Sequence, residues 1–530
     1  MSTDVVRIRT GVYHDSVSLM RVSRAAADLP GVEVAVVAMA TGLNLGIAAD
    51  LGFAPPPPGP SGPAGPGDLL IALRGEADAL EGAVAALDGL LDGLSVSAAG
   101  GAAVEHPPRT VRAAARGRTA TLALVSVPGP HAFAEALDAI EAGLSVMIFS
   151  DNVPVGQEVL LKRRAAERGV LVMGPDCGTA VIGGAGLGFA NVLRPGPVGV
   201  VAASGTGAQQ VTCLLDIAGV GVSHVLGVGG RDLSAEVGGL STLRALEALD
   251  ADPATELIVL ISKPPAPEVA RVVGEAVAGL RTPVVNALLG PAGAGRADLT
   301  SAAEAALRAL GVPVPDWPHW PAPSPFPSEG PSAGPAGDGA TGIAGPAGDR
   351  AEGAGGPRGI YSGGTLCVEA RLIAGSGEFT DFGDDAYTVG RAHPMIDPAL
   401  RLEALAAVPA GGVALLDVVL GHGADPDPSA RLAPAIAGAV ARGVAVVVAL
   451  VGSEGDPQGL NAQAEALNAA GAAVFTSNAR AARHAAELAG ATGTADVTGV
   501  TGAAATDATD AADATGAAGT GAVTRSGGRP

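Results

Sequence analysis

The sequence is poor in the residues that mark several large classes of protein. Its three cysteines, Cys177, Cys213 and Cys367, lie far apart with no CxxC spacing, which excludes a disulfide framework and offers no zinc site. Aromatic residues make up only 2% of the chain, and every basic side chain except Lys162 and Lys263 is arginine. No apolar run approaches the roughly 20 residues that a membrane helix needs. We therefore predict neither a metal site nor a membrane span.

Positive charge is also scarce. The formal net charge is −21, from 53 acidic and 32 basic residues, and no basic cluster is large enough to neutralise a nucleic-acid backbone. The N-terminus carries acidic and arginine residues early and lacks the apolar segment of a signal peptide. We expect a cytoplasmic protein that acts on a small-molecule substrate, without nucleic-acid or membrane partners.

Alternating apolar strands and helical patterns run through most of the chain. Strands are expected near residues 5–12, 32–40, 69–73, 120–127, 145–150, 170–174, 198–203, 224–229, 257–262, 283–289, 359–361, 414–419, 444–451 and 473–475. Nearly continuous apolar strands between helices are typical of parallel sheets. Residues 321–358 and 491–530 lack this periodicity and are expected to be a disordered linker and a disordered tail. The fold class is therefore α/β, with globular blocks over 1–105, 106–195, 196–320 and 359–490.

Two of these blocks contain the same strand, glycine turn and helix. One copy ends a strand with Ser204, Gly205 and Thr206, and the other ends a strand with Ser362, Gly363, Gly364 and Thr365. Each is followed by a second acidic, glycine-containing turn, formed by Gly229, Gly230, Arg231 and Asp232 in one copy and by residues 381–385 in the other. Glycines expose backbone N–H groups, and a helix N-terminus attracts anions. We predict two phosphate- or carboxylate-binding half-sites, with ordinary capped turns as the alternative.

Two further strand ends carry polar candidates. Gly174, Pro175, Asp176 and Cys177 follow one strand, at the position where open parallel sheets bind ligands. Cys177 is either a nucleophile or, more commonly for an isolated thiol, a buried structural residue. Lys263 follows another strand and, in a chain that otherwise uses arginine, suggests a point charge for a phosphate or carboxylate. A surface lysine in a proline-rich turn is the alternative.

The densest polar segment runs from Asp384 to Pro398. In it Arg391 could clamp a carboxylate, and His393 could act as an acid or base with Asp397 as its orienting partner. The alternative is a turn-rich connection in which Asp397 merely starts a helix. We predict Arg391, His393, Asp397 and Lys263 as the catalytic residues. His422 more simply reads as a loop residue at a strand end.

These segments together resemble the FdrA proteins. The resemblance rests on residues 15–20, 146–153, 172–179, 226–234, 262–265 and 387–398, and covers roughly residues 5–490. This family is similar to succinyl-CoA synthetase, with residues 120–310 matching its α subunit and 360–490 the carboxyl domain of its β subunit. The resemblance implies a Rossmann-like CoA-binding-type domain followed by two flavodoxin-like ligase-type domains. It also implies a CoA-type pocket formed by Pro128, Asp151, Asn152, Gly174, Pro175, Asp176 and Cys177.

Three departures from that pattern bear on activity. The first glycine-rich CoA-phosphate loop has no counterpart, no ATP-grasp domain is present, and residues 289–295 contain no histidine where the phosphorylated one should lie. CoA binding is therefore doubtful. We expect an acyl-CoA synthetase-superfamily protein that handles an acyl phosphate or carboxylate. One alternative is a carbamoyltransferase subunit that uses carbamoyl phosphate in oxamate or ureide catabolism. The other is a non-catalytic subunit of a complex. Partner subunits or a homo-oligomer are expected.

Overall fold

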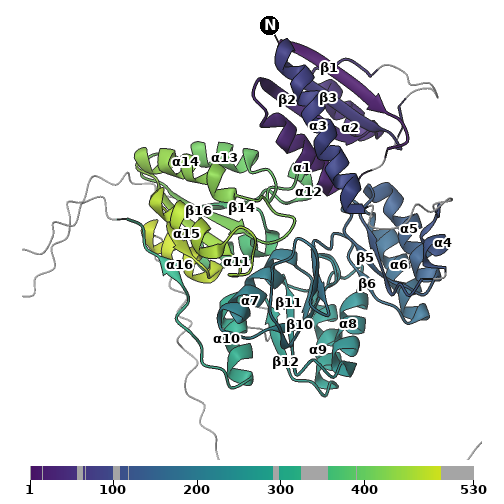
Figure 1. Cartoon of the computed structure of the whole chain (residues 1–530). Coiled ribbons are helices and arrows are strands. Elements are labelled where there is room, and N and C mark those ends of the chain that lie inside the picture. The colour runs from purple at the N-terminus through teal and green to yellow at the C-terminus, as the bar shows by residue number, and fades with distance from the viewer. Residues whose placement is uncertain are drawn as a thin grey trace, which may run out of the picture. The chain divides into compact units, whose positions relative to one another are not determined.

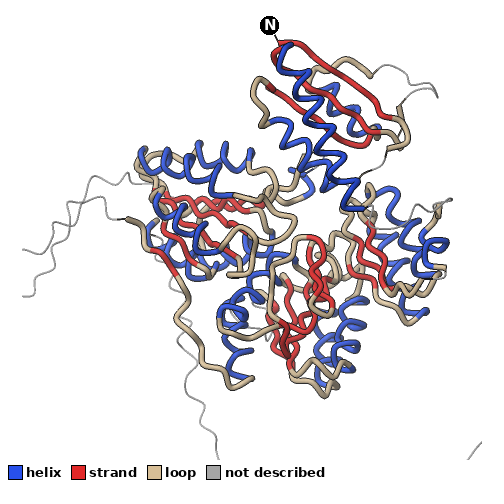
Figure 2. Tube along the Cα trace, in the orientation of Figure 1, coloured by secondary structure: helices blue, strands red, loops and turns tan. Residues whose placement is uncertain are grey.

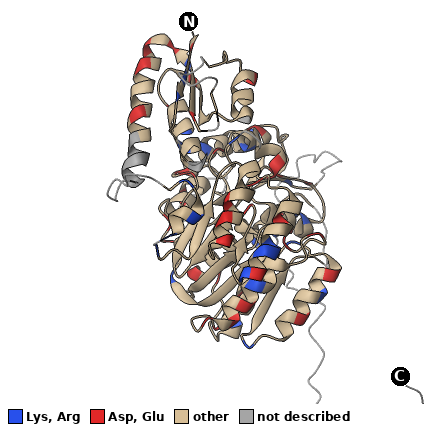
Figure 3. Ribbon diagram, turned by 90° about the vertical axis from the view of Figure 1, so that its right-hand side faces the viewer, with Lys and Arg blue, Asp and Glu red and all other residues tan. Residues whose placement is uncertain are grey.

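The computed structural model describes residues 2–12, 14, 16–56, 64–65, 67–98, 108–116, 118–290, 298–323, 356–388 and 391–490. Within them the protein is a mixed α/β chain built on four sheets (Figures 1 and 2). The expected linker and tail lie outside these residues, apart from 321–323 and 356–358. Among the described helices, none is long and apolar enough to cross a membrane. In the view of Figure 3, basic residues are dispersed along helices that also carry Asp and Glu.

The N-terminal block is a three-stranded antiparallel sheet in the order β1-β3-β2. On β3, Leu69, Ile71 and Leu73 pack against α1 and α3, and Leu70 and Ala72 pack near α2 on the other face. Because both faces are covered, β3 is apolar at successive positions. The elements are β1 (Ser2–Arg9), α1 (Ser16–Ala27), β2 (Val32–Met39), α2 (Gly42–Asp50), β3 (Leu69–Glu76) and α3 (Ala77–Ala98).

The second block holds a short parallel sheet in the order β4-β5-β6. Helix α5 packs against β4 and β5, and α6 against β6, as the alternating pattern predicted. Its elements are α4 (Val111–Ala115), β4 (Leu122–Val125), α5 (Gly129–Glu141), β5 (Ser145–Ile148), α6 (Val155–Arg168) and β6 (Val172–Met173).

The third block is a six-stranded sheet in the order β12-β11-β9-β10-β7-β8. Strands β12, β11, β9 and β10 are parallel, whereas β7 and β8 form an antiparallel hairpin at the edge. The sequence reading did not include this hairpin, although its Gly183-Gly184 turn, with φ of 56° and 84°, is a typical hairpin signal. The elements are β7 (Thr179–Ile182), β8 (Ala185–Gly188), β9 (Pro195–Ala202), α7 (Gly205–Ile217), β10 (Val222–Gly227), α8 (Leu240–Ala251), β11 (Leu257–Ser262), α9 (Pro267–Ala278), β12 (Val284–Leu288) and α10 (Leu299–Ala309).

The fourth block is a second six-stranded sheet in the order β13-β18-β17-β16-β14-β15. It is parallel except for β13, which pairs antiparallel with β18. The elements are β13 (His319–Trp320), β14 (Arg358–Tyr361), α11 (Gly364–Ala374), β15 (Glu378–Asp381), α12 (Asp385–Thr388), α13 (Ala399–Ala406), β16 (Val413–Val419), α14 (Pro428–Ala441), β17 (Ala445–Val451), α15 (Leu460–Ala469), β18 (Ala473–Phe475) and α16 (Asn478–Leu488).

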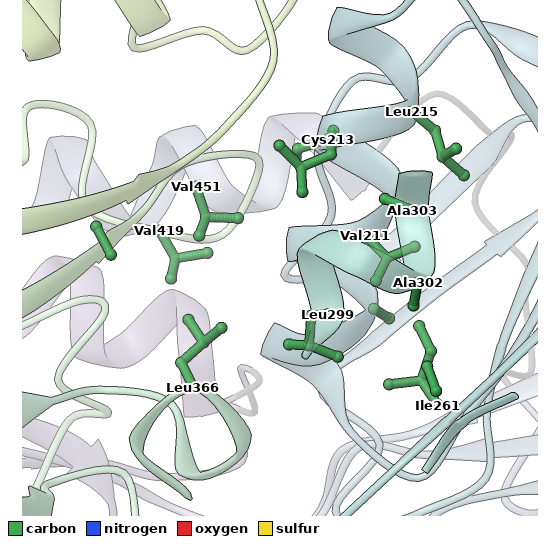
Figure 4. Close-up of a cluster of buried hydrophobic side chains, with 14 of the residues drawn as sticks. Val211, Cys213, Leu215, Ile261, Leu299, Ala302, Ala303, Leu366, Val419 and Val451 are labelled. Carbon is green, nitrogen blue, oxygen red and sulfur yellow. The ribbon is translucent and has the colours of Figure 1, made fainter. Parts of the chain in front are cut away.

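The two six-stranded sheets share one buried apolar core (Figure 4). Val211 and Leu215 of α7 and Leu299 of α10 belong to the same cluster as Leu366 of α11 and Val419 of β16. Helices α7, α10, α11 and α16 contact one another between the two blocks. Buried hydrogen bonds cross the same boundary, since the Gln210 side chain donates to the Thr476 carbonyl and accepts from the Asn478 N–H, both at 2.9 Å. The two copies of the glycine turn are thereby held in one packed unit.

Candidate functional site

The two predicted half-sites meet. A Cβ added to Gly363, the residue before α11, would collide with the side chain of Thr206 in the first turn of α7. A Cβ on Gly207 of α7 would lie 3.1 Å from Cγ2 of Thr365. The N-termini of α7 and α11 therefore lie against each other. The sequence predicted two anion sites, and the tertiary structure combines them into a single junction.

The junction concentrates backbone donors. Ser204 caps α7, its hydroxyl oxygen accepting from the Gly207 N–H at 2.9 Å, whereas α11 begins at Gly363 without a side-chain cap. The first N–H groups of a helix have no partner within that helix. Two helix N-termini also place their partial positive charges at the same point. The residues predicted as anion-binding at Gly205, Thr206, Gly364 and Thr365 all lie at this junction.

Ser362 has a different role from the one predicted. Its N–H and its hydroxyl both donate to the carboxylate of Asp417, at 2.7 and 3.0 Å. Asp417 is fully buried in β16 and is paired with Arg401 of α13 at 2.9 Å. Both donors are therefore engaged by Asp417 in this structure, and they fix the start of α11. Asp417 was not among the predicted site residues, although a carboxylate within the otherwise apolar run Val413–Val419 is a signal that the sequence contains.

Lys263 faces the junction from the end of β11. A Cβ on Gly364 would lie 2.9 Å from the Lys263 Nζ and 2.5 Å from an Asp381 carboxylate oxygen. Burial raises the pKa of Asp381 to about 6, partly offset by the Gly383 N–H and by Lys263. Lys263 is half-buried, and within the described residues its ammonium has no hydrogen bond or ion pair, although the Asp381 carboxylate interacts with it electrostatically. A cation held without a hydrogen bond beside two helix N-termini is suited to an anionic ligand.

The carboxyl end of the β4-β5-β6 sheet gathers the residues predicted as a CoA-type pocket. The hydroxyl of Ser150 donates to the Val127 carbonyl at 2.6 Å, and the Asp176 N–H donates to the Ser150 carbonyl at 3.0 Å. A Cβ on Gly129 would collide with the Asp151–Asn152 backbone. The loops that carry Pro128, Asp151, Asn152 and Gly174–Cys177 are thus packed side by side.

Asp176 links this loop cluster electrostatically to the junction. Its side chain is open to solvent, yet desolvation by the surrounding protein raises its pKa to about 7. Asp385 and Asp151 raise the pKa further, and Lys263 and Arg231 lower it. An accessible carboxylate with this pKa exchanges its proton near neutral pH.

The loop after β10 is largely structural. Asp232 is fully buried and accepts hydrogen bonds from Lys162, the Ser241 N–H and Thr242. The Arg231 guanidinium donates to Glu158 and to the Val153 carbonyl. Anion binding by Asp232 is therefore wrong, since this residue has no access to a ligand. Gly229, with φ of 91°, packs its Cα against Gly174 and Pro175, whereas Gly230 is open.

All three cysteines are buried. Cys177 is 2% exposed, and burial raises the pKa of its thiol to about 12. Burial likewise raises the pKa values of Cys213 and Cys367. A nucleophilic cysteine needs a stabilised thiolate, so the structural alternative for Cys177 is the one that the structure supports.

Only part of the polar segment that follows β15 lies at the candidate site. The Asp397 carboxylate pairs with Arg431 at 2.7 Å and with Arg24 at 3.4 Å, and it has no contact with the His393 ring. The predicted His393–Asp397 pair is therefore wrong. Arg391 is exposed, and within the described residues its side chain has no hydrogen bond or ion pair. His393 does face the junction, since a Cβ on Gly383 would lie 2.9 Å from its Nε2 and 3.2 Å from Asp381 Oδ1.

Residues 1–107 and the start of α5 offer few groups to a metal ion or to the pyrophosphate of CoA. Residues 1–107 contain no cysteine, and no group of three potential ligands occurs among the described residues. Helix α5 begins Pro128-Gly129-Pro130, where Pro130 has no N–H and the His131 N–H already donates to the Pro128 carbonyl. The start of α5 therefore offers few free N–H groups to a pyrophosphate.

Three family models match separate parts of the chain. The model described as "AllF, heavy metal-associated domain" matches residues 1–107, the CoA binding domain model matches 194–290, and the CoA-ligase model matches 360–488. The CoA-binding match contains α7. It lies mainly in residues 196–320, which the sequence predicted to be the ligase α-type domain, and not in the predicted CoA-binding-type block of residues 106–195. The CoA-ligase match contains α11. The chain thus carries CoA-binding-type and CoA-ligase-type domains.

Whole-chain comparison identifies relatives of two kinds. The chain is 36% identical to "Uncharacterized protein YahF" of Escherichia coli, over 90% of this chain and 97% of that protein. It is 30% identical to subunit alpha 2 of an Archaeoglobus fulgidus succinate–CoA ligase, over 29% of this chain and 54% of that subunit. A solved acetyl-coenzyme A synthetase of Ca. Korarchaeum cryptofilum is 16% identical, with a TM-score of 0.27 over 72% of this chain and 84% of that one. That score is too low to support an argument. By its near full-length match, the chain belongs to the same protein family as YahF.

Proposed function

We propose that this chain is an FdrA-type member of the acyl-CoA synthetase superfamily that binds an acyl phosphate at the α7–α11 junction. The observation that carries the proposal is the meeting of two helix N-termini beside Lys263, whose ammonium has no hydrogen bond or ion pair in the described residues. Backbone N–H groups and one ammonium together stabilise a phosphate and the charge that it gains as a leaving group.

An acyl phosphate explains why no carrier histidine is needed. In a nucleotide-driven ligase, phosphate must travel from the nucleotide to the acid, which requires a carrier. Residues 225–318 contain no histidine, and no ATP-grasp domain is recognisable in the sequence. A ready-made mixed anhydride already carries its activation, so that the protein needs only to hold the phosphate and orient the carbonyl.

A specific observation favours carbamoyl phosphate, with transfer to an uncharged or cationic acceptor, as the second candidate. Asp151, Asp176 and Asp385 lie near enough to interact electrostatically around the approach from the β4-β5-β6 sheet. Such a surface disfavours the several phosphates of CoA more than the single phosphate of carbamoyl phosphate, and it tolerates an amide or amine acceptor. In this second candidate function, partner subunits carry out the reaction steps that this chain does not.

Lys263→Met tests the phosphate site. Calorimetric titration with acetyl phosphate, carbamoyl phosphate and CoA should give binding of at least one acyl phosphate to the wild type. Loss of one charged hydrogen bond should weaken that binding about 10- to 100-fold. Arg271→Met is the matched control, because this exposed cation of α9 pairs only with Glu275.

Three outcomes separate the proposals. No binding of either acyl phosphate to the wild type contradicts the function. Equal binding by Lys263→Met removes the lysine from the site. Tight binding of CoA without carbamoyl phosphate rejects the second candidate.

A further inference from the structure

His393 is held in one orientation. Its ring lies against Phe189, with the ring centroids 5.5 Å apart. Its carbonyl accepts from the N–H groups of Ile396 and Asp397 at 2.8 and 3.0 Å, and its Nδ1 accepts from the Met395 N–H at 3.3 Å. Backbone, ring face and one ring nitrogen are therefore all fixed by neighbouring groups.

The Met395 contact determines which nitrogen carries the proton. A backbone N–H only donates, so Nδ1 must present its lone pair. In a neutral imidazole the other nitrogen then carries the hydrogen. Nε2 is thus an N–H donor, and it has no lone pair with which to take up a proton or attack phosphorus.

The charged groups that face the ring are Arg401 of α13 and Asp381 at the end of β15. Burial and then the Arg401 charge lower the pKa of His393 to about 4. The ring is neutral at physiological pH, and the Nε2–H form is the one that the Met395 contact selects.

Nε2 points toward the junction. A Cβ on Gly383 would lie 2.9 Å from Nε2 and 3.2 Å from Oδ1 of Asp381. The other carboxylate oxygen of Asp381 lies 2.5 Å from the point that a Cβ on Gly364 would occupy, and Lys263 Nζ lies 2.9 Å from that point. His393, Asp381 and Lys263 therefore follow one another along the start of α11. Within the described residues Nε2 has no hydrogen-bond partner of its own.

We propose that His393 donates its Nε2–H to the carbonyl oxygen of the acyl phosphate whose phosphate lies at the α7–α11 junction. This inference rests on the proposed function and assigns His393 a different role from the acid or base that the sequence suggested. The imidazole keeps its proton throughout.

The reaction step balances without a proton on or off His393. The acceptor's lone pair forms a bond to the carbonyl carbon, and the C=O π electrons move to the oxygen that Nε2–H stabilises. The C=O bond then re-forms, the bond from carbon to the phosphate oxygen breaks, and phosphate leaves with that electron pair. The acceptor loses its own proton to the departing phosphate. A fixed N–H donor at a developing oxyanion contributes about 100- to 1,000-fold to turnover.

The tautomer is tested without any substrate. Nitrogen-15 NMR of histidine-labelled wild-type protein contains signals from eight histidines, and the His393 signals are those lost in His393→Gln. We expect a pyrrole-type Nε2 and a pyridine-type Nδ1 that persist unchanged from pH 8 to pH 5.5. The opposite tautomer, or protonation within this range, overturns the proposal even if the phosphate site is real.

The contact is tested with carbamoyl phosphate labelled with carbon-13 at its carbonyl. Its C=O stretching frequency should fall on binding to the wild type, and less so on binding to His393→Ala. His393→Gln places an amide N–H near the position of Nε2 and should keep part of the shift and of the phosphate-release rate, whereas His393→Asn should not. His422→Gln, at an exposed loop histidine, is the matched control.

The outcomes separate the two proposals. An unchanged frequency in His393→Ala, with carbamoyl phosphate still bound, overturns the role of His393 and leaves the site intact. Failure of the wild type to bind carbamoyl phosphate or acetyl phosphate rejects the proposed function, and with it this role.

Discussion

Gly207 of α7 lies against Thr365 of α11, where a Cβ on the glycine would be only 3.1 Å from the threonine Cγ2. The two residues are 158 positions apart in sequence and belong to the two copies of one motif. Their contact places both helix N-termini at a single point, which is the basis of the anion site.

Gly363→Ala should weaken both the junction and the fold. Its Cβ would lie 2.6 and 2.7 Å from Cγ2 and Cβ of Thr206 and would also meet the Thr206 hydroxyl. Overpacking of this kind costs about 1–3 kcal/mol of unfolding free energy, measurable by urea denaturation. Gly438→Ala in α14 is the control, since nothing lies within 4 Å of the new Cβ and alanine favours a helix. Equal stabilities for the two variants would show that the helices separate freely.

Sulfate binding should depend on the protonation of Asp176. Desolvation by the surrounding protein, Asp385 and Asp151 raise the pKa of this exposed carboxyl to about 7, so it becomes negative as pH rises through 7. A negative charge near Lys263 opposes an anion, and sulfate itself does not titrate in this range. We expect sulfate to bind about fivefold more tightly at pH 6 than at pH 8. In Asp176→Asn the affinity should stay high and almost constant, and a pH dependence equal to that of the wild type would exclude Asp176 as its source.

Lys162→Met should destabilise the protein strongly. The Lys162 ammonium donates to Glu158 and Asp232, both at 2.7 Å, and to the Val228 carbonyl at 3.0 Å, and all three charged groups are buried. Removing the cation leaves the buried Asp232 carboxylate without a counter-charge and Glu158 with Arg231 as its remaining cationic partner, at a cost of about 3–5 kcal/mol. Arg164→Met, which removes ion pairs with Glu141 and Glu167 at the surface, should destabilise the protein far less, because solvent screens such pairs. Thermal denaturation of both variants compares them, and similar losses would contradict the buried-network argument.

Local pattern predicted most of the elements. Apolar runs such as Leu257–Ser262 and Val413–Val419 are strands because their side chains are buried on both faces of a parallel sheet, and that leaves a continuous signal in sequence. The hairpin of β7 and β8 was not predicted because β8, with the sequence Ala-Gly-Leu-Gly, lacks a continuous apolar run. Strand β15 was not predicted either, since it is four residues long and leads into a polar segment.

The roles of the charged residues could not be predicted in the same way. The sequence predicted Asp232, Asp397 and Ser362 as site residues, yet each forms hydrogen bonds or ion pairs with protein groups. Lys263 and Asp381 are the ones that face the junction. Local sequence does not distinguish a paired carboxylate from a free one, because Arg24 lies 373 residues from Asp397 and Lys162 lies 70 residues from Asp232.

The sequence by itself determined the α/β class, the order of the elements and the presence of two glycine turns at helix starts. These properties follow from periodicity and turn chemistry within a few residues. Only the tertiary structure decided that the two turns form one junction, that the Lys263 ammonium has no hydrogen bond or ion pair among the described residues, and that Nδ1 of His393 accepts from the Met395 N–H. Such properties depend on burial and on contacts between distant segments, since packing determines which polar groups are satisfied and which remain available to a ligand.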